Sequence, residues 1–202
     1  GYFRMTLDKF KENLRSVEDG KPLAALVFPL APEIFTAMDI PTYIIAGEPL
    51  MGLEDTTQYI DEANRIGLAS SICALLRENV VLVEQGLVPL PTVLVSTTHP
   101  CDSVNIAYQA IAAHKDWRKI PKFVADGLYL TGERNLSYYA DEIKRLVSFL
   151  EEHTGHRMDI DRLQEVIEES NKQVKLWQEY SELRRAVPVS YTHLRAHETV
   201  LD

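Results

Sequence analysis

The stretch from Thr92 to Ala107, TVLVSTTHPCDSVNIA, constrains the fold of this chain more than any other. It opens with an apolar, β-branched run that is typical of a buried strand. Polar residues follow, and then Pro100, which favours an extended conformation for the residue before it. Cys101 comes next, and Asp102 and Ser103 are good N-cap residues for a helix. The stretch therefore predicts a thiol between a strand and a helix N-terminus, where ligands bind in open α/β sheets.

The second cysteine of the chain occupies a similar predicted position. A helix is expected through Val83, with Ser70 or Ser71 as its N-cap, and this places Cys73 in the first turn. A helix N-terminus favours the thiolate, which is the form that binds metal. Two cysteines at two helix N-termini together indicate a ligand site. The alternative is that both are small core residues, since free cysteine is often buried.

Strands and helices alternate along the chain, which predicts an α/β fold. Apolar runs that read as buried strands occur at residues 23–30, 42–46, 92–95 and 122–125. We expect a flavodoxin-like or Rossmann-like parallel sheet of about four strands with flanking helices. Two long helices are predicted after Asn135 and after Asp159 or Asp161. They form either a C-terminal arm or two further helices on the same core.

Composition excludes several classes of protein. The formal net charge of the 202 residues is −9, which argues against a nucleic-acid-binding protein. No apolar run is long enough to span a bilayer, so we expect no membrane association. No signal peptide opens the chain, so a cytoplasmic location is expected. Two cysteines are too few for a disulfide scaffold. Dinucleotide and P-loop fingerprints are absent.

Four segments resemble the family of 2-hydroxyacyl-CoA dehydratase and benzoyl-CoA reductase subunits. The segments are APEIFTAMDIPTYI, LASSICALLREN, VLVSTTHPCDS and YYADEIKRLVSFLEEHTGHRMDIDRLQEVIEESNK, and the resemblance covers about Leu23 to Pro188. It implies a [4Fe–4S] cluster held by three cysteines, of which Cys73 and Cys101 match the first and second. Hydroxyl and amide donors close to the cluster are then expected from Ser71, Thr97, Thr98, Asp102 and Ser103. The catalytic residues stay unknown.

The resemblance also implies a domain organisation. Residues 1–131 are expected to form the cluster-binding α/β domain, and residues 132–188 a helical arm leading to a second α/β domain. The family's third cysteine lies in that second domain, so the chain is expected to be an N-terminal fragment. Residues 189–202, VSYTHLRAHETVLD, break the helical pattern and are expected to be a non-native read-through tail.

The function implied is radical elimination of water from a 2-hydroxyacyl-CoA, after one-electron reduction by an ATP-dependent iron–sulfur activator protein. A second homologous subunit would complete a heterodimer, and the fragment alone is expected to be inactive. One alternative is a benzoyl-CoA reductase-type subunit that delivers electrons to an aromatic acyl-CoA. Another, from a different class, is a non-catalytic α/β binding or assembly subunit.

Overall fold

The computed structural model describes residues 2–45, 56–99, 101–127 and 132–186, so the expected tail at 189–202 lies outside the described residues. The described chain divides into a unit that ends at Asp159 and a second unit that starts at Ile160. None of the helices in these ranges combines the length and the apolar character needed to cross a membrane.

Four strands form one parallel sheet, which confirms the predicted fold class. They are β1 (Ala24–Leu26), β2 (Thr42–Ile44), β3 (Val93–Thr97) and β4 (Lys122–Ala125). The spatial order is β2-β1-β3-β4, so the strand order reverses between β1 and β3. This is the start of the flavodoxin-like order, in which ligands bind at the carboxyl ends of the strands next to the reversal.

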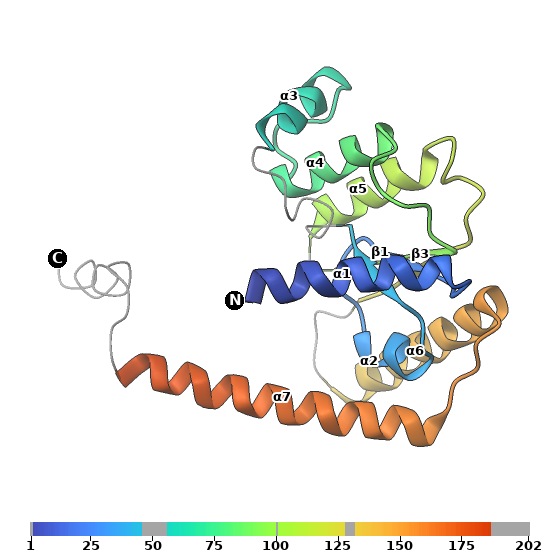
Figure 1. Cartoon of the computed structure of the whole chain (residues 1–202), viewed down its shortest axis with the longest axis vertical. Helices are drawn as coiled ribbons and strands as arrows, with labels where there is room; N and C mark the ends of the chain where they lie inside the picture. The colour runs from blue at the N-terminus through green and yellow to red at the C-terminus, as the bar shows by residue number, and fades with distance from the viewer. Residues whose placement is uncertain (1, 46–55, 100, 128–131, 187–202) are drawn as a thin grey trace. The chain divides into compact units, whose positions relative to one another are not determined.

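Helices cover both faces of the sheet (Figure 1). The connections contribute α2 (Pro32–Ala37), α3 (Thr57–Arg65), α4 (Ala74–Glu84) and α5 (Asp102–Ala113). α4 and α5 lie on one side of the sheet, and α2 lies on the other together with α6 (Glu133–Thr154). A parallel sheet buried on both faces explains why its strands read as continuous apolar runs rather than as alternating patterns.

Side chains alternate between the two faces along each strand. Ala25, Tyr43 and Leu94 pack in one core cluster with residues of α4 and α5, including Val81 and Val104. Their neighbours in the strands therefore face the α2 and α6 side. This parity decides which polar side chains of β3 lie on the same face as the two cysteine-bearing helices.

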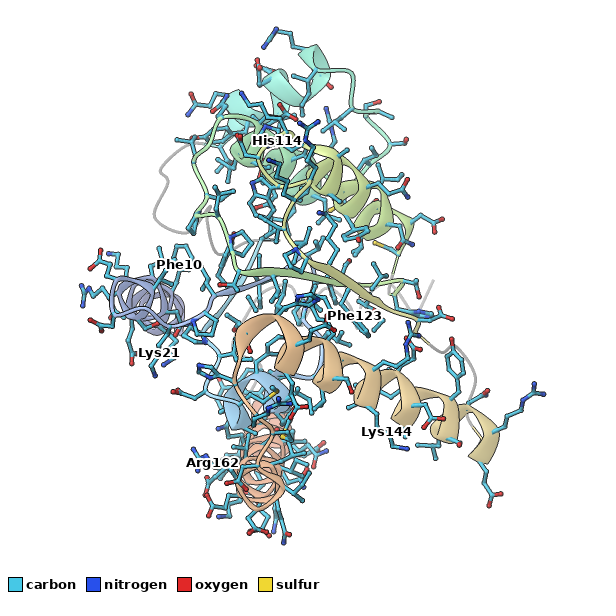
Figure 2. The ribbon with its side chains drawn as sticks, turned by 90° about the vertical axis from the view of Figure 1, so that its right-hand side faces the viewer. Phe10, Lys21, His114, Phe123, Lys144 and Arg162 are labelled. Atoms are coloured by element: carbon cyan, nitrogen blue, oxygen red, sulfur yellow. The ribbon has the colours of Figure 1, made fainter. Side chains whose placement is uncertain are left out.

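α6 packs on the sheet, which is one of the two arrangements that the sequence left open. Leu146 and Leu150 are fully buried, and the ring of Phe149 lies 5.4 Å from that of Phe123 on β4. Figure 2 shows Phe123 between the sheet and this helix, and Lys144 on the opposite side of the helix. Gly155 ends α6 in a left-handed conformation with φ of 75°, as its position in the sequence predicts.

Two further helices complete the described chain. α1 (Tyr2–Glu18) packs against the edge strand β2, where Asn13 Nδ2 donates to the carbonyl oxygen of Thr42 at 2.7 Å. α7 (Ile160–Ala186) belongs to the second unit and is described by itself. The domain boundaries expected near residues 131 and 188 stay predictions.

Three expected helix starts are wrong. α4 has Cys73 rather than Ser70 or Ser71 as its N-cap, and α5 has Cys101 rather than Asp102 or Ser103. α6 starts after Gly132 rather than at Asn135. In the first two cases the N-cap is a cysteine, although the serine or aspartate residues expected there are better N-caps. This indicates that backbone geometry set by the sheet decides where the helix starts.

Replacing Leu94 by alanine tests the position of the core. Leu94 lies on the central strand β3 and is fully buried, so Leu94→Ala is expected to lower the free energy of unfolding by about 2–5 kcal/mol. Leu90→Ala is the matched control, because 56% of Leu90 is exposed, and its expected effect is within about 0.5 kcal/mol. Equal effects of the two substitutions in chemical denaturation would contradict the assignment of β3 to the core.

Candidate functional site

The N-termini of α4 and α5 meet at the carboxyl edge of the sheet. The two helices are packed side by side, and the backbone N–H of Cys73 donates to Ser103 Oγ at 3.3 Å. Ser103 follows Cys101 by two residues, so this hydrogen bond brings the two cysteine-bearing segments together although they are far apart in sequence. The sequence placed each cysteine at a helix start, and the structure adds that the two starts are adjacent.

Both cysteines are N-cap residues, and neither thiol is used in capping. Cys73 precedes α4 and Cys101 precedes α5, and neither side chain hydrogen-bonds to the first turn of its helix. Both cysteines are free and exposed. A serine or aspartate at an N-cap typically stabilises a helix by about 1 kcal/mol relative to a residue that makes no cap bond. Two thiols in these places leave that stabilisation unused and keep both sulfurs available to a ligand.

Ser96 on β3 is the polar side chain that sequence reasoning missed on this side of the sheet. It shares the parity of Leu94, so it faces α4 and α5. Its side chain is fully buried, and Ser96 Oγ has no hydrogen-bond partner. A buried hydroxyl without a partner is rare because its desolvation is not compensated. The motif TTHPCDS indicated a site in the residues after the strand, whereas Ser96 lies within β3.

The predicted hydroxyl donors have different surroundings. Thr97 has the opposite parity to Ser96, and its Oγ1 accepts a hydrogen bond from the N–H of His99 at 3.3 Å. Asp102 is exposed directly after Cys101, and Ser71 is exposed two residues before Cys73. Ser103 is the residue that joins the two helix starts. Of the expected donors, Ser103 is thus the one that the structure places between both cysteine-bearing segments.

Thr98 links the loop after β3 to the end of β4. Its hydroxyl donates to Asp126 Oδ1 at 2.9 Å and accepts from the N–H of Gly127 at 2.9 Å. The hydroxyl of Tyr138 on α6 donates to Asp126 Oδ2 at 3.0 Å. These hydrogen bonds hold the pKa of Asp126 below its ordinary value, with the Thr98 hydroxyl as the largest cause. Asp126 and Tyr138 carry no sequence signal, because their partners are distant along the chain.

Cys73 and Cys101 are side chains at this edge of the sheet that could ligate a metal. No group of three or more His, Cys, Asp or Glu side chains with metal-binding geometry occurs among the described residues. The sequence contains two cysteines, and a cubane cluster of the expected type takes three or four thiolates. The structure therefore offers two exposed thiols at adjacent helix starts, which is fewer than such a cluster needs. Any further thiolate has to come from outside these residues.

Replacing Thr98 tests the hydrogen bonds at Asp126. A lowered pKa means that Asp126 keeps its charge, and the Thr98 contact, as the pH falls through the ordinary carboxyl range. Thr98→Val removes the largest cause, so the midpoint of the Asp126 titration followed by carboxyl ¹³C NMR is expected to rise. Tyr138→Phe, which removes the second cause, is expected to raise it less. An unchanged midpoint in Thr98→Val would show that the contact is not formed in solution.

Comparison with known proteins shows the family of the chain. A model of the family described as 2-hydroxyglutaryl-CoA dehydratase, D-component, matches residues 29–201. None of the curated proteins gives a significant match. The matched range includes all of β2, β3, β4, α4 and α5, and therefore both cysteines and the residues around them. Because the match spans most of the sequence, the chain belongs to the 2-hydroxyglutaryl-CoA dehydratase D-component family.

Proposed function

We propose that the chain is a subunit of a 2-hydroxyacyl-CoA dehydratase in which Cys73 and Cys101 are two ligands of a [4Fe–4S] cluster. The observation that supports this most is the hydrogen bond from the Cys73 N–H to Ser103 Oγ. It joins two thiol-bearing helix starts at the edge of the sheet where doubly wound folds bind ligands. Core cysteines without a function have no reason to converge there in exposed positions.

The surroundings of the two thiols suit a cluster. Ile72, which directly precedes Cys73, and Val104 in the first turn of α5 are buried and apolar, and an apolar wall limits solvent access and tunes a cluster's potential. The first N–H groups of a helix have no partner within the helix, so both helix starts offer donors for cluster sulfurs. We assign Ser96 the same role, with Ser71, Thr97, Thr98, Asp102 and Ser103 as further polar residues around the site.

When bound, the cluster would supply one electron to the thioester carbonyl of the substrate. The 2-hydroxyl group would leave and combine with the proton lost from the β-carbon to form water, and the electron would return to the cluster. The role of this chain is to hold two of the irons and to shield them. The loss of water is redox-neutral overall, so no net reductant is consumed by the elimination itself. The catalytic acid and base stay unassigned.

The proposal implies several partners. A third thiolate has to come from a further domain or another chain, because the two cysteines of this sequence are both used. We infer a second homologous subunit, an ATP-dependent iron–sulfur activator protein that delivers the electron, and an acyl-CoA substrate. A thiolate-ligated cluster with an open iron suits a reducing compartment, so we infer a cytoplasmic location.

The test is the iron content of the complete subunit, purified anaerobically together with its partner. The wild-type complex is expected to contain about four irons per cluster with a cluster absorption band. Cys73→Ala and Cys101→Ala are each expected to lose most of this iron together with dehydration of a 2-hydroxyacyl-CoA. Leu75→Ala is the matched control, because Leu75 lies in the first turn of α4 with an exposed side chain.

Two results would reject the assignment of Cys73 and Cys101 as cluster ligands. A wild-type complex without stoichiometric iron after reconstitution would favour a non-catalytic binding or assembly subunit. A complex that retains its cluster in both cysteine variants would show that other residues are the ligands. A complex that holds iron and reduces benzoyl-CoA, but does not dehydrate a 2-hydroxyacyl-CoA, would support the ligand assignment and reject the dehydratase assignment.

A further inference from the structure

A chain of hydrogen bonds ties the loop before Cys101 to α6. We call it the Asp126 clamp, and it consists of Thr98, Asp126, Tyr138, Glu142 and Arg145. Thr98 lies at the end of β3, Asp126 follows β4, and the other three lie on α6. The two cysteine-bearing helices lie on the other face of the sheet from α6 (Figure 1). The clamp therefore crosses from the back of the sheet to the edge where the site lies.

Thr98 is held on several sides. Its hydroxyl bonds to Asp126 Oδ1 and to the N–H of Gly127, each at 2.9 Å. Its own N–H donates to the carbonyl oxygen of Ala125 at 3.0 Å, and Asn105 Nδ2 on α5 donates to its carbonyl oxygen at 3.3 Å. Thr98 is thus fixed to the end of β4 and to α5 at the same time, three residues before Cys101.

The other end of the clamp is anchored in the interior. Glu142 is 3% exposed, and its Oε2 accepts from the N–H of Asp126 at 3.1 Å. Its Oε1 is paired with Arg145 Nη1. Burying a carboxylate is unfavourable unless it is paired and hydrogen-bonded. The paired Glu142 carboxylate therefore fixes the backbone at Asp126 through this hydrogen bond.

Next to the clamp, Gly127, which follows Asp126, lies in direct contact with His99, which follows Thr98. A Cβ atom at Gly127 would lie 2.0 Å from His99 Nδ1 and 2.4 Å from His99 Cγ. These distances leave no room for a side chain, so the imidazole ring of His99 lies directly over the Gly127 backbone. His99 is therefore also in contact with the segment that follows β4.

We propose that Asp126 is a positioning residue for Cys101, because it fixes Thr98, and Thr98 in turn accepts a hydrogen bond from Asn105 on α5, the helix whose N-cap is Cys101. This rests on the proposed function, in which Cys101 is a cluster ligand. Ligand distances in metal sites hold within about 0.2 Å, so the start of α5 has to be fixed relative to the sheet if Cys101 is a ligand. The contact between Asn105 and Thr98 joins this helix to the end of β3, and Asp126 holds Thr98 in place.

The test measures how often the two thiols meet, without any iron. Dibromobimane becomes fluorescent when it alkylates two nearby thiols, and this chain contains only Cys73 and Cys101. The bridging rate, divided by the rate with monobromobimane, is compared between wild type, Asp126→Ala and Asp126→Asn. Asp141→Ala is the matched control, because Asp141 lies on the same helix α6 as an exposed partner of Lys144.

Asp126→Ala is expected to lower the normalised bridging rate about fivefold or more, the factor that corresponds to losing one hydrogen bond of ordinary strength. Asp126→Asn keeps an oxygen that accepts from Thr98, so it is expected to stay within about twofold of wild type, as is Asp141→Ala. Unchanged bridging in Asp126→Ala, or a loss in Asp126→Asn as large as in Asp126→Ala, would overturn the positioning role.

Tyr138→Phe provides a second variant if Asp126→Ala does not fold. It removes one hydroxyl from a side chain that is 43% exposed, so the fold is expected to survive and the bridging rate to fall by a smaller factor. No change in bridging by folded Tyr138→Phe would then overturn the proposal. The iron content of the complete complex separates the cluster assignment from the positioning role of Asp126. A wild-type complex without iron would reject the cluster, whereas the bridging rate would still show whether Asp126 positions Cys101.

Discussion

The hydrogen bond between the Cys73 N–H and Ser103 Oγ is the contact on which the proposed site depends. It exists because the sheet is parallel and its strand order reverses between β1 and β3. Parallel strands place all their carboxyl ends at one edge, and the crossover helices start from that edge. α4 precedes β3 and α5 follows it, on the same face, so their N-termini become neighbours. The two cysteines, which are the N-cap residues of these helices, are then brought together by topology.

Much of the fold could be predicted from the sequence, because it depends on local patterns. The strand at Lys122–Ala125 and the helix end at Gly155 follow from apolar runs and from the conformational freedom of glycine, and both are found as expected. The helix N-caps were not predictable in the same way. Ser71 and Asp102 are better caps than cysteine, so propensity pointed to the wrong residues. The backbone path out of the sheet overrides that preference at Cys73 and Cys101.

The site was predictable as far as residue types and not as far as contacts. A motif of thiol, hydroxyl and proline residues indicates where chemistry lies, and it led to Cys101 and Ser103. Ser96 was missed because whether an in-strand hydroxyl has a partner depends on what packs over it. Asp126 and Glu142 were missed because each looks like an ordinary surface carboxylate in sequence. Only the packing of α6 on the sheet buries Glu142 and orients Asp126 toward Thr98.

The central claim, that Cys73 and Cys101 lie together at one edge of the sheet, is tested most directly by the distance between nitroxide labels on these two native cysteines. A reference distance within the same chain comes from a second labelled pair, which we call the ruler pair. It consists of Cys101 and the cysteine of Ala113→Cys in a Cys73→Ala background, and these two positions lie at the two ends of α5. A helix of 12 residues is about 18 Å long. Pulsed electron paramagnetic resonance is expected to give a clearly shorter mean distance for the native pair than for the ruler pair. A native-pair distance equal to or longer than the ruler would contradict the site.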